Sequence, residues 1–191
     1  MIAQIDGAMS KEECEHWVGV FERREQRWNV RPEHYFHPAT ADEKILGRLR
    51  SCATLCRNLF ESPEQLVPET AILTKFLPGG QMGVHADNCR RDARGEWAPN
   101  HTPNRDVTAI FYLSEGFVGG ELVLPQWGLS IKPRRGLLVT FPSDGGHMHQ
   151  VDRVESGERY TLTVWMTKSE NASIWAKAWT KEWTKEWTKA R

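Results

Sequence analysis

From Thr70 onward the chain consists of short β-rich runs separated by glycine and proline, and this pattern limits the possible folds more than any other feature. Short strands at regular intervals, with turn residues between them, favour a β-sandwich or jelly roll over alternating βαβ units. Pro78-Gly79-Gly80 and Gly119-Gly120 are expected turns. Eight strands are predicted, over residues 70–77, 83–87, 106–114, 120–125, 129–132, 136–142, 147–153 and 158–167.

Two helices are expected before the strands, which makes the predicted fold class α+β. Ser10–Glu13 and Thr40–Glu43 are capping-box sequences, and helical periodicity follows each of them. Within residues 1–65 these helices are expected to brace one face of the sheet. The side chains expected to be buried are Cys14, Trp17, Val18 and Phe21 in the first helix, and Leu46, Leu49, Ala53, Cys56 and Phe60 in the second.

Length and composition indicate one domain with a substantial core, because the chain has 191 residues. Lys+Arg and Asp+Glu are both 25, so neither nucleic acid nor an anionic membrane is expected as a partner. No signal peptide and no stretch of about 18 apolar residues is visible. Cys52 and Cys56 are expected to pack as small apolar groups rather than to form a disulfide. A cytoplasmic location is therefore expected.

His85-Ala86-Asp87, followed about sixty residues later by His149, matches the ligand set of a non-haem Fe(II) site. Residues i and i+2 of a strand point to the same side, so His85 and Asp87 can reach one metal ion at a strand end. A third ligand must come from a distant strand. His147 is the rival to His149 for that role, and His149 is preferred because of its interval to Arg159.

Arg159 begins a run that alternates between two kinds of residue, with Thr161, Thr163 and Trp165 on its own side. A period of two is typical of a strand whose faces meet different environments. A face with one arginine and two threonines suits a pocket for a dicarboxylic acid, in which Arg159 would hold a terminal carboxylate bidentately. A surface strand with a solvated arginine is the alternative.

Taken together, these motifs resemble those of the Fe(II)/2-oxoglutarate dioxygenases of the prolyl hydroxylase type, and most closely the catalytic domains of prolyl 3-hydroxylases. The resemblance covers about residues 70–167 and implies that these residues form a double-stranded β-helix (jelly-roll) core. The enzyme domain as a whole is expected to span residues 1–168. It implies Fe(II), 2-oxoglutarate and O2 as cofactor and co-substrates, with release of succinate and CO2. The residues that carry it are His85-x-Asp87, His149-Gln-Val, Arg159, Arg105–Leu113 and Gly119-Gly120-Glu121.

The resemblance also implies roles for single residues. His85, Asp87 and His149 would be the iron ligands and Arg159 the carboxylate clamp, which Tyr112 would support through its hydroxyl. Phe76 departs from the family, which often has a tyrosine at this point of the first strand. The other residues expected to bind the cofactor or line its pocket are Asn88, Thr108, Thr163 and Trp165.

Residues 88–104 form a polar segment without periodicity, directly after the proposed ligands. Long loops in compact domains are often lids or binding loops, so Trp97 and His101 are candidates for contact with substrate. An inert insertion is the alternative, and Arg105 would position substrate or brace the lid. His34 and His37 are expected to be surface or packing residues, with an approach to substrate as the alternative.

Tryptophan recurs every four residues near the C-terminus, at Trp175, Trp179, Trp183 and Trp187. Residues 169–191 are therefore predicted to form a helical tail with one oblique tryptophan stripe. Packing on the domain's own sheet is the preferred interpretation. A homodimer contact is the alternative, and membrane-surface binding is disfavoured because Glu182 and Glu186 share the helix with lysines.

The function predicted from these features is 2-oxoglutarate-dependent hydroxylation of a C–H bond. The substrate would be a prolyl or other amino-acid residue in a peptide, a free amino acid or a natural-product intermediate. Two alternatives stay open, namely a cupin-type metalloenzyme that does not use 2-oxoglutarate and a non-catalytic jelly-roll binding module.

Overall fold

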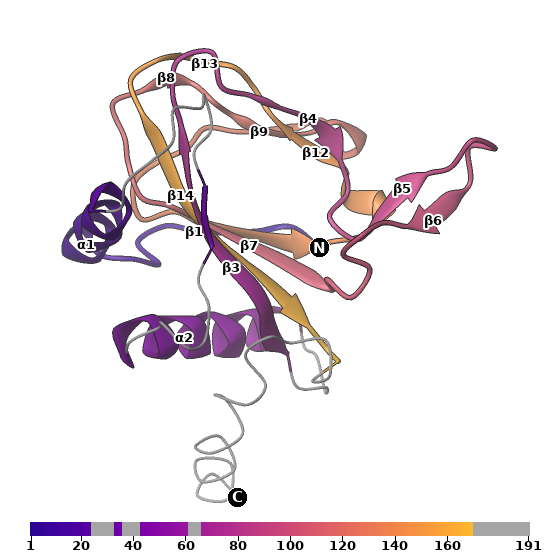
Figure 1. The fold of residues 1–191 in the computed structure, drawn as a ribbon, viewed down its shortest axis with the longest axis horizontal. Helices are drawn as coiled ribbons and strands as arrows, with labels where there is room; N and C mark the ends of the chain where they lie inside the picture. Colours follow the sequence, from indigo (N-terminus) through magenta and orange to yellow (C-terminus); the bar gives the residue numbers. More distant parts are fainter. Residues whose placement is uncertain (24–32, 36–42, 61–65, 170–191) are drawn as a thin grey trace, which may run out of the picture.

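The fold, in a computed structural model that describes residues 1–23, 33–35, 43–60 and 66–169, consists of two antiparallel sheets and two helices (Figure 1). The larger sheet has the strand order β1-β11-β7-β14-β3-β2, and the smaller has the order β10-β9-β12-β4. In the larger sheet the strands are β1 (Ala3–Ile5), β11 (Leu138–Pro142), β7 (Val107–Tyr112), β14 (Arg159–Thr167), β3 (Val67–Phe76) and β2 (Glu33–Tyr35). In the smaller sheet they are β10 (Leu129–Ile131), β9 (Leu122–Leu124), β12 (His149–Val151) and β4 (Met82–His85).

Two short ribbons complete the strands, β13 (Val154–Ser156) with β8 (Val118–Gly119), and β5 (Cys89–Arg91) with β6 (Trp97–Pro99). All eight predicted strands are present, most of them shorter than predicted. The expectation that 88–104 lacks regular structure was wrong, because β5 and β6 pair as a hairpin that projects from the body of the molecule (Figure 1). Strands β1, β2, β8 and β13 were not predicted either, since runs of two or three residues give no readable period.

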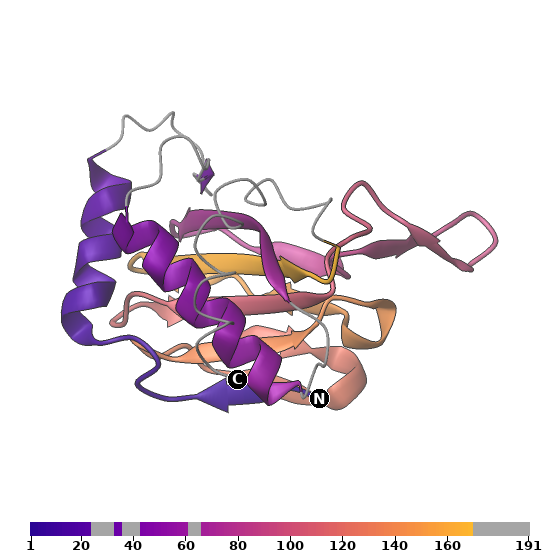
Figure 2. The same cartoon turned by 90° about the horizontal axis from the view of Figure 1, so that it is seen from below.

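The two helices are α1 (Lys11–Glu22) and α2 (Glu43–Leu59). The capping box at the start of α1 is confirmed, because Ser10 Oγ accepts the Glu13 N–H at 3.2 Å and a Glu13 carboxylate oxygen accepts the Ser10 N–H at 2.9 Å. The start of the second capping box, residues 40–42, lies outside the described residues. Figure 2 shows α2 lying across the outer face of the larger sheet.

The main core lies between this outer face and the helices. It includes Trp17 and Phe21 of α1 and Leu49 and Cys56 of α2, which pack with the apolar side chains of β3, β7 and β14. The predicted buried residues Cys14, Trp17, Phe21, Leu49, Ala53 and Cys56 are buried, whereas Val18 and Phe60 are only partly so. The side chain of Leu46 lies outside the described part of the chain.

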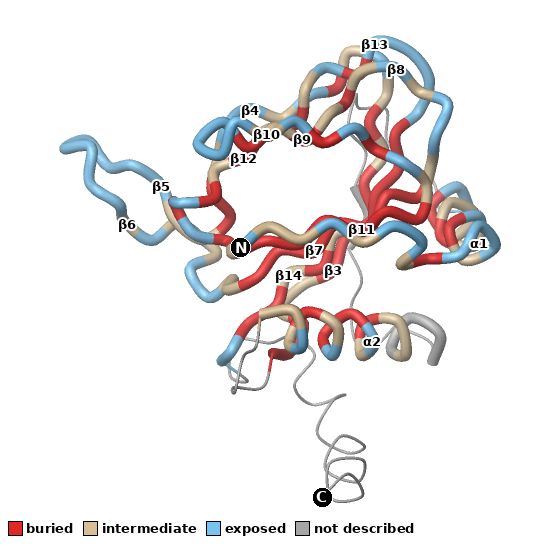
Figure 3. Tube along the Cα trace, turned by 180° about the vertical axis from the view of Figure 1, so that it is seen from behind, coloured by how far each residue is buried: buried red, intermediate tan, exposed pale blue. Residues whose placement is uncertain are grey.

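Strand β14 presents different residues to its two faces. Leu162, Val164 and Met166 belong to the core shared with the helices. Arg159, Thr161, Thr163 and Trp165 point the other way and line a cavity between the sheets. Figure 3 shows that buried residues follow β3, β7 and β14, while the β5–β6 hairpin is exposed. One face of the larger sheet therefore packs against the core, and the other face lines the cavity.

Candidate metal centre and its cavity

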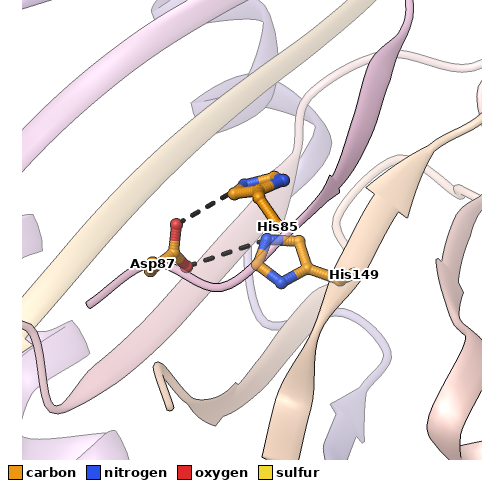
Figure 4. A group of neighbouring side chains, drawn as sticks. All are labelled: His85, Asp87 and His149. Atoms are coloured by element: carbon orange, nitrogen blue, oxygen red, sulfur yellow. Dashed lines mark ion pairs between the residues drawn. The ribbon is translucent and has the colours of Figure 1, made fainter. Parts of the chain in front are cut away.

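Three side chains that could hold a metal ion meet at one end of the smaller sheet. His85 is the last residue of β4 and pairs directly with His149, the first residue of β12. Asp87 follows two residues later, in a bend beyond the strand. One potential ligand atom from each residue lies within 4.8 Å of the others, and in Figure 4 the three side chains point toward one another.

The hydrogen bonds of the two imidazoles leave the same nitrogen of each ring for a metal. His85 Nδ1 lies 2.9 Å from the carbonyl oxygen of Gly83, and His149 Nδ1 lies 3.1 Å from that of His147. Each Nδ1–H can therefore donate to a carbonyl, which leaves Nε2 with its lone pair. Both Nε2 atoms lie 3.7 Å from a carboxylate oxygen of Asp87, too far for a hydrogen bond and close enough for a shared ion.

The donor set fits Fe(II). Two imidazole nitrogens and one carboxylate, all on one side of the site, are the ligands of the facial triad, which leaves other coordination positions open. Metal binding needs a neutral imidazole. Burial lowers the pKa of His149, so its neutral form is favoured.

A layer of hydroxyl groups and main-chain atoms holds Asp87 in place. Thr108 Oγ1 donates to Asp87 Oδ2 at 2.5 Å and lies 2.8 Å from Ser143 Oγ. The carbonyl oxygen of Ser143 accepts the Asp87 N–H at 3.1 Å, and Thr102 Oγ1 donates to the Asp87 carbonyl at 2.7 Å. The sequence interpretation missed Ser143 and Thr102, because a hydroxyl that contacts a ligand through tertiary structure leaves no spacing pattern.

A cavity of about 310 Å³ extends from these three residues across the inner face of the larger sheet. His85 and the exposed His101 lie toward solvent, whereas Arg159 is only 2% exposed. The other residues that line the cavity include Ile72, Thr74 and Phe76 of β3, Thr161, Thr163 and Trp165 of β14, and Asn100, Thr102 and Arg105.

Arg159 places a buried cation in this cavity. Its Nε donates to the carbonyl oxygen of Gly120 at 2.9 Å, and its guanidinium carbon lies 5.0 and 5.1 Å from the ring centres of Phe76 and Tyr112. Among the described residues no carboxylate forms an ion pair with it. Burial lowers the pKa of Arg159, and a buried charge without a partner is costly, so the site fits an anionic ligand.

Gly120 is needed for this arrangement. Its φ is +70°, a backbone conformation that favours glycine, and a Cβ at this position would lie 2.8 Å from Arg159 Cδ. The predicted Gly119-Gly120 turn therefore also makes room for the arginine and supplies its hydrogen-bond acceptor.

Tyr112 lies beside Arg159 and is not itself among the cavity-lining residues. Its side chain is fully buried, and its hydroxyl makes no hydrogen bond of normal geometry in the described part of the chain, although it lies close enough to the Arg159 guanidinium to interact with it. Burial raises the pKa of Tyr112, so the hydroxyl keeps its proton and can donate. A buried hydroxyl normally has a partner, and a carboxylate bound to Arg159 would supply an acceptor next to it.

The remaining predicted residues fall into two groups. Thr163, Trp165 and His101 line the cavity, as does Thr108. Asn88 does not, because its side-chain amide donates to the carbonyl oxygen of Arg105 at 2.9 Å.

Two further candidates lie outside the cavity lining. Trp97 packs against Gly145, where a Cβ would approach its ring to 2.4 Å. His147 is not on the strand predicted over 147–153, because residues 145–147 form a 3₁₀ turn before β12. His34 lies on β2, and His37 lies outside the described residues.

Arg105 and Trp165 form the rim of the cavity near the metal ligands. The Arg105 guanidinium lies 3.6 Å above the Trp165 ring, and its Nε donates to Glu69 at 3.1 Å. The indole Nε1 of Trp165 is buried and has no hydrogen-bond partner among the described residues.

Comparison with protein families gives a match to the model of the 2OG-Fe(II) oxygenase superfamily over residues 71–167. Prolyl 3-hydroxylase 2 of Gallus gallus is 34% identical over 135 residues, which are 65% of this chain and 20% of that protein. A PKHD-type hydroxylase of Shewanella oneidensis is 34% identical over 128 residues, 63% of this chain and 53% of that protein. The chain thus spans about a fifth to a half of these two relatives.

Solved structures show the same fold. A viral collagen prolyl hydroxylase from Paramecium Bursaria Chlorella virus-1, in complex with 2OG, gives a TM-score of 0.67 at 20% identity and covers 86% of this chain and 94% of its own. A prolyl-4-hydroxylase of Pseudomonas putida gives 0.64 at 21% identity, with 88% and 92% covered. The expected jelly-roll core is therefore confirmed. No helix in the described residues has both the length and the apolar character that a membrane span requires.

Proposed function

The chain belongs to the 2OG-Fe(II) oxygenase superfamily, and from this premise we propose that it is an Fe(II)- and 2-oxoglutarate-dependent hydroxylase. The observation that carries the proposal is the pairing of two features in one cavity. His85, Asp87 and His149 gather at the outer end, and the buried Arg159, which forms no ion pair with any of the described residues, lies at the inner end. A molecule with a metal-binding group and a distal carboxylate satisfies both.

In this proposal His85, Asp87 and His149 hold Fe(II), and Arg159 binds the distal carboxylate of 2-oxoglutarate. Tyr112 donates a further hydrogen bond to that carboxylate, and Thr161 and Thr163 line the channel between the two ends. Thr108 keeps the Asp87 carboxylate oriented through its 2.5 Å hydrogen bond. When bound, the metal and co-substrate supply O2-dependent oxidation of a C–H bond, with release of succinate and CO2.

The substrate class rests on the relatives and on the rim of the cavity. Relatives named prolyl 3-hydroxylase and PKHD-type hydroxylase support an amino-acid or prolyl side chain, in a peptide or free. Arg105, Trp165 and His101 offer donors at the rim, beside the metal ligands. We propose that they orient the substrate C–H bond toward the metal.

A cupin-type metalloenzyme that does not use 2-oxoglutarate would share the triad. It would have no need for a buried arginine at the inner end of the cavity, so Arg159 weighs against it. A non-catalytic module would be expected to lose a ligand, and all three are in place.

Succinate formation tests the proposal. Purified protein is incubated with Fe(II), 2-oxoglutarate and O2, with and without prolyl peptides and free amino acids, and succinate is measured. We expect succinate that depends on Fe(II) and on 2-oxoglutarate, and an increase with a true substrate. His149→Ala is the inactive control. Iron binding without any 2-oxoglutarate consumption, under all substrates, would favour the cupin-type alternative.

A further inference from the structure

The chain reaches His149 through a turn that is held from two sides. Residues Asp144 to His147 form this turn, and Gly145–His147 is its 3₁₀ segment. Trp97 of the β5–β6 hairpin packs on Gly145, and Trp127 stacks on His147 from the other side. The contacts of this turn exceed what a simple connection between β11 and β12 needs.

His147 is anchored within the turn by its own ring. Its Nδ1 lies 2.8 Å from Asp144 Oδ1, which also accepts the N–H of Gly146 at 2.9 Å. The ring stacks on Trp127 with 5.2 Å between centroids and an interplanar angle of 24°. Trp127 is fixed in turn, because its Nε1 donates to the Gly146 carbonyl at 2.9 Å.

Packing alone does not explain a histidine at this position. The side chain is buried, and its Nε2 has no hydrogen-bond partner among the described residues. An unpaired buried nitrogen is unfavourable, whereas phenylalanine would fill the space without one. The contribution specific to histidine is therefore its Nδ1 bond to Asp144.

The peptide fixed in this way contacts the metal centre directly. The carbonyl oxygen of His147 lies 3.1 Å from Nδ1 of His149 and sets the orientation of that ring. Phe141 packs edge-on against the same ring at 4.8 Å. Partners of this kind align a metal-binding imidazole and fix its tautomer.

We propose that His147 is a positioning residue for the metal ligand His149. Its ring, held by Asp144 and Trp127, fixes the carbonyl that accepts the Nδ1–H of His149, so that Nε2 faces the metal. This inference rests on the metal centre of the proposed function. It assigns His147 no place among the ligands, in agreement with its absence from the cavity lining.

Co(II) binding tests the proposal without any need for turnover. His147→Phe keeps the stack on Trp127 and loses the bond to Asp144, whereas His147→Asn can keep a donor near Asp144 and loses the stack. Affinity is measured by competition with a chelator, and the visible absorption of bound Co(II) reports ligand geometry. We expect His147→Phe to bind at least about tenfold more weakly with an altered spectrum, and His147→Asn to lose less.

Leu49→Ala is the matched control, because Leu49 of α2 is fully buried in the core between the helices and the larger sheet and is not among the cavity-lining residues. It should lower the thermal unfolding midpoint of the metal-free protein at least as much as His147→Phe does, with wild-type Co(II) affinity and spectrum. If His147→Phe binds Co(II) with the affinity and spectrum of the wild type, the inference about His147 is overturned and the proposed metal centre is not. Loss of all Co(II) in His147→Phe, with retention in His149→Ala, would make His147 a ligand. A wild-type protein that binds no Co(II) would overturn the metal centre and the inference together.

Discussion

In the proposed function, Arg159 is the residue that binds the distal carboxylate of the co-substrate. Loss of a hydrogen bond to a charged group costs about 1.5–3 kcal/mol, and about 1.4 kcal/mol is one decade in affinity. We therefore expect Arg159→Ala to raise the apparent 2-oxoglutarate constant at least about tenfold, measured as uncoupled succinate formation. Tyr112→Phe should give a smaller rise, because only a supporting hydroxyl is removed.

Iron binding is the control for this prediction. Arg159 is not among the three metal-binding side chains, so Arg159→Ala should bind Fe(II) as the wild type does. An unchanged 2-oxoglutarate constant in Arg159→Ala would mean that the co-substrate binds elsewhere or is another molecule.

Single residues of the site differ in how far the sequence could reveal them. His85 and Asp87 share a motif, and Arg159 lies ten residues after His149, so local spacing was enough to select them as candidates. Ser143 reaches the site only because β11 pairs with β7, which brings it to Thr108. Asn88 was expected to bind cofactor because it follows Asp87, yet its amide turns toward the main chain of Arg105.

At the level of elements, the β5–β6 hairpin and the turn before His149 fit together through one close contact. Gly145 has no positive φ, and the three atoms nearest to the position of a Cβ there all belong to the Trp97 ring, the first at 2.4 Å, so alanine is disfavoured by that ring. We expect Gly145→Ala to weaken Co(II) binding, because the displaced turn carries His149. The same change in a Trp97→Ala background should have a much smaller effect. Equal effects in the two backgrounds would show that the contact with Trp97 is not the cause.

A second contact between elements joins the end of α1 to the larger sheet. Tyr160 of β14 donates to Glu22 and lies 2.8 Å from Glu158, and Lys75 of β3 pairs with both carboxylates. Burial acts to raise the pKa of Glu158, but the Lys75 ammonium and the Tyr160 hydroxyl beside it hold that pKa below its ordinary value of 4.5. Between this lowered pKa and 4.5, the Glu158 carboxyl is protonated in the unfolded state and ionised in the folded state. The free energy of unfolding therefore falls as the pH falls through this range.

We expect Lys75→Met to lose less stability than the wild type as the pH is lowered below 4.5, because the pKa of Glu158 then returns toward its ordinary value. Urea unfolding at neutral pH and at about pH 4 measures the difference. Arg134→Met is the control, since its ion pair with Asp6 is exposed on both sides and should contribute little. A pH dependence in Lys75→Met equal to that of the wild type would contradict this account of Glu158.

For the molecule as a whole, the predicted tail offers a test of the domain boundary. Residues 170–191 lie outside the described part of the chain, and the four-residue tryptophan period is the basis for a helix that packs on the domain. We expect truncation after Lys168 to lower the free energy of unfolding without changing the mass in solution. Light scattering separates this from the dimer alternative, which predicts a change from dimer to monomer. A truncation with neither effect would contradict both.

The whole fold could be predicted only in part. The regular spacing of short strands from Thr70 indicated a sandwich or jelly roll, and the alternation in β14 assigned its polar face to a pocket. Which strands pair was beyond reach, because β1 joins β11 across more than 130 residues and does so with three residues. Short-range patterns contain no record of such pairings.

The depth of Arg159 has a kinetic consequence. The cavity is lined both by His85, whose side chain is 32% exposed, and by Arg159, which is 2% exposed, so we infer that it opens on the side of His85. A substrate bound at the opening of the cavity would block access to its inner end. The co-substrate that binds Arg159 must therefore bind before the substrate, and the product formed from it must dissociate last. Steady-state rates should then follow a compulsory order. Excess substrate that enters an empty cavity blocks the way inward, and the rate should pass through a maximum as its concentration rises.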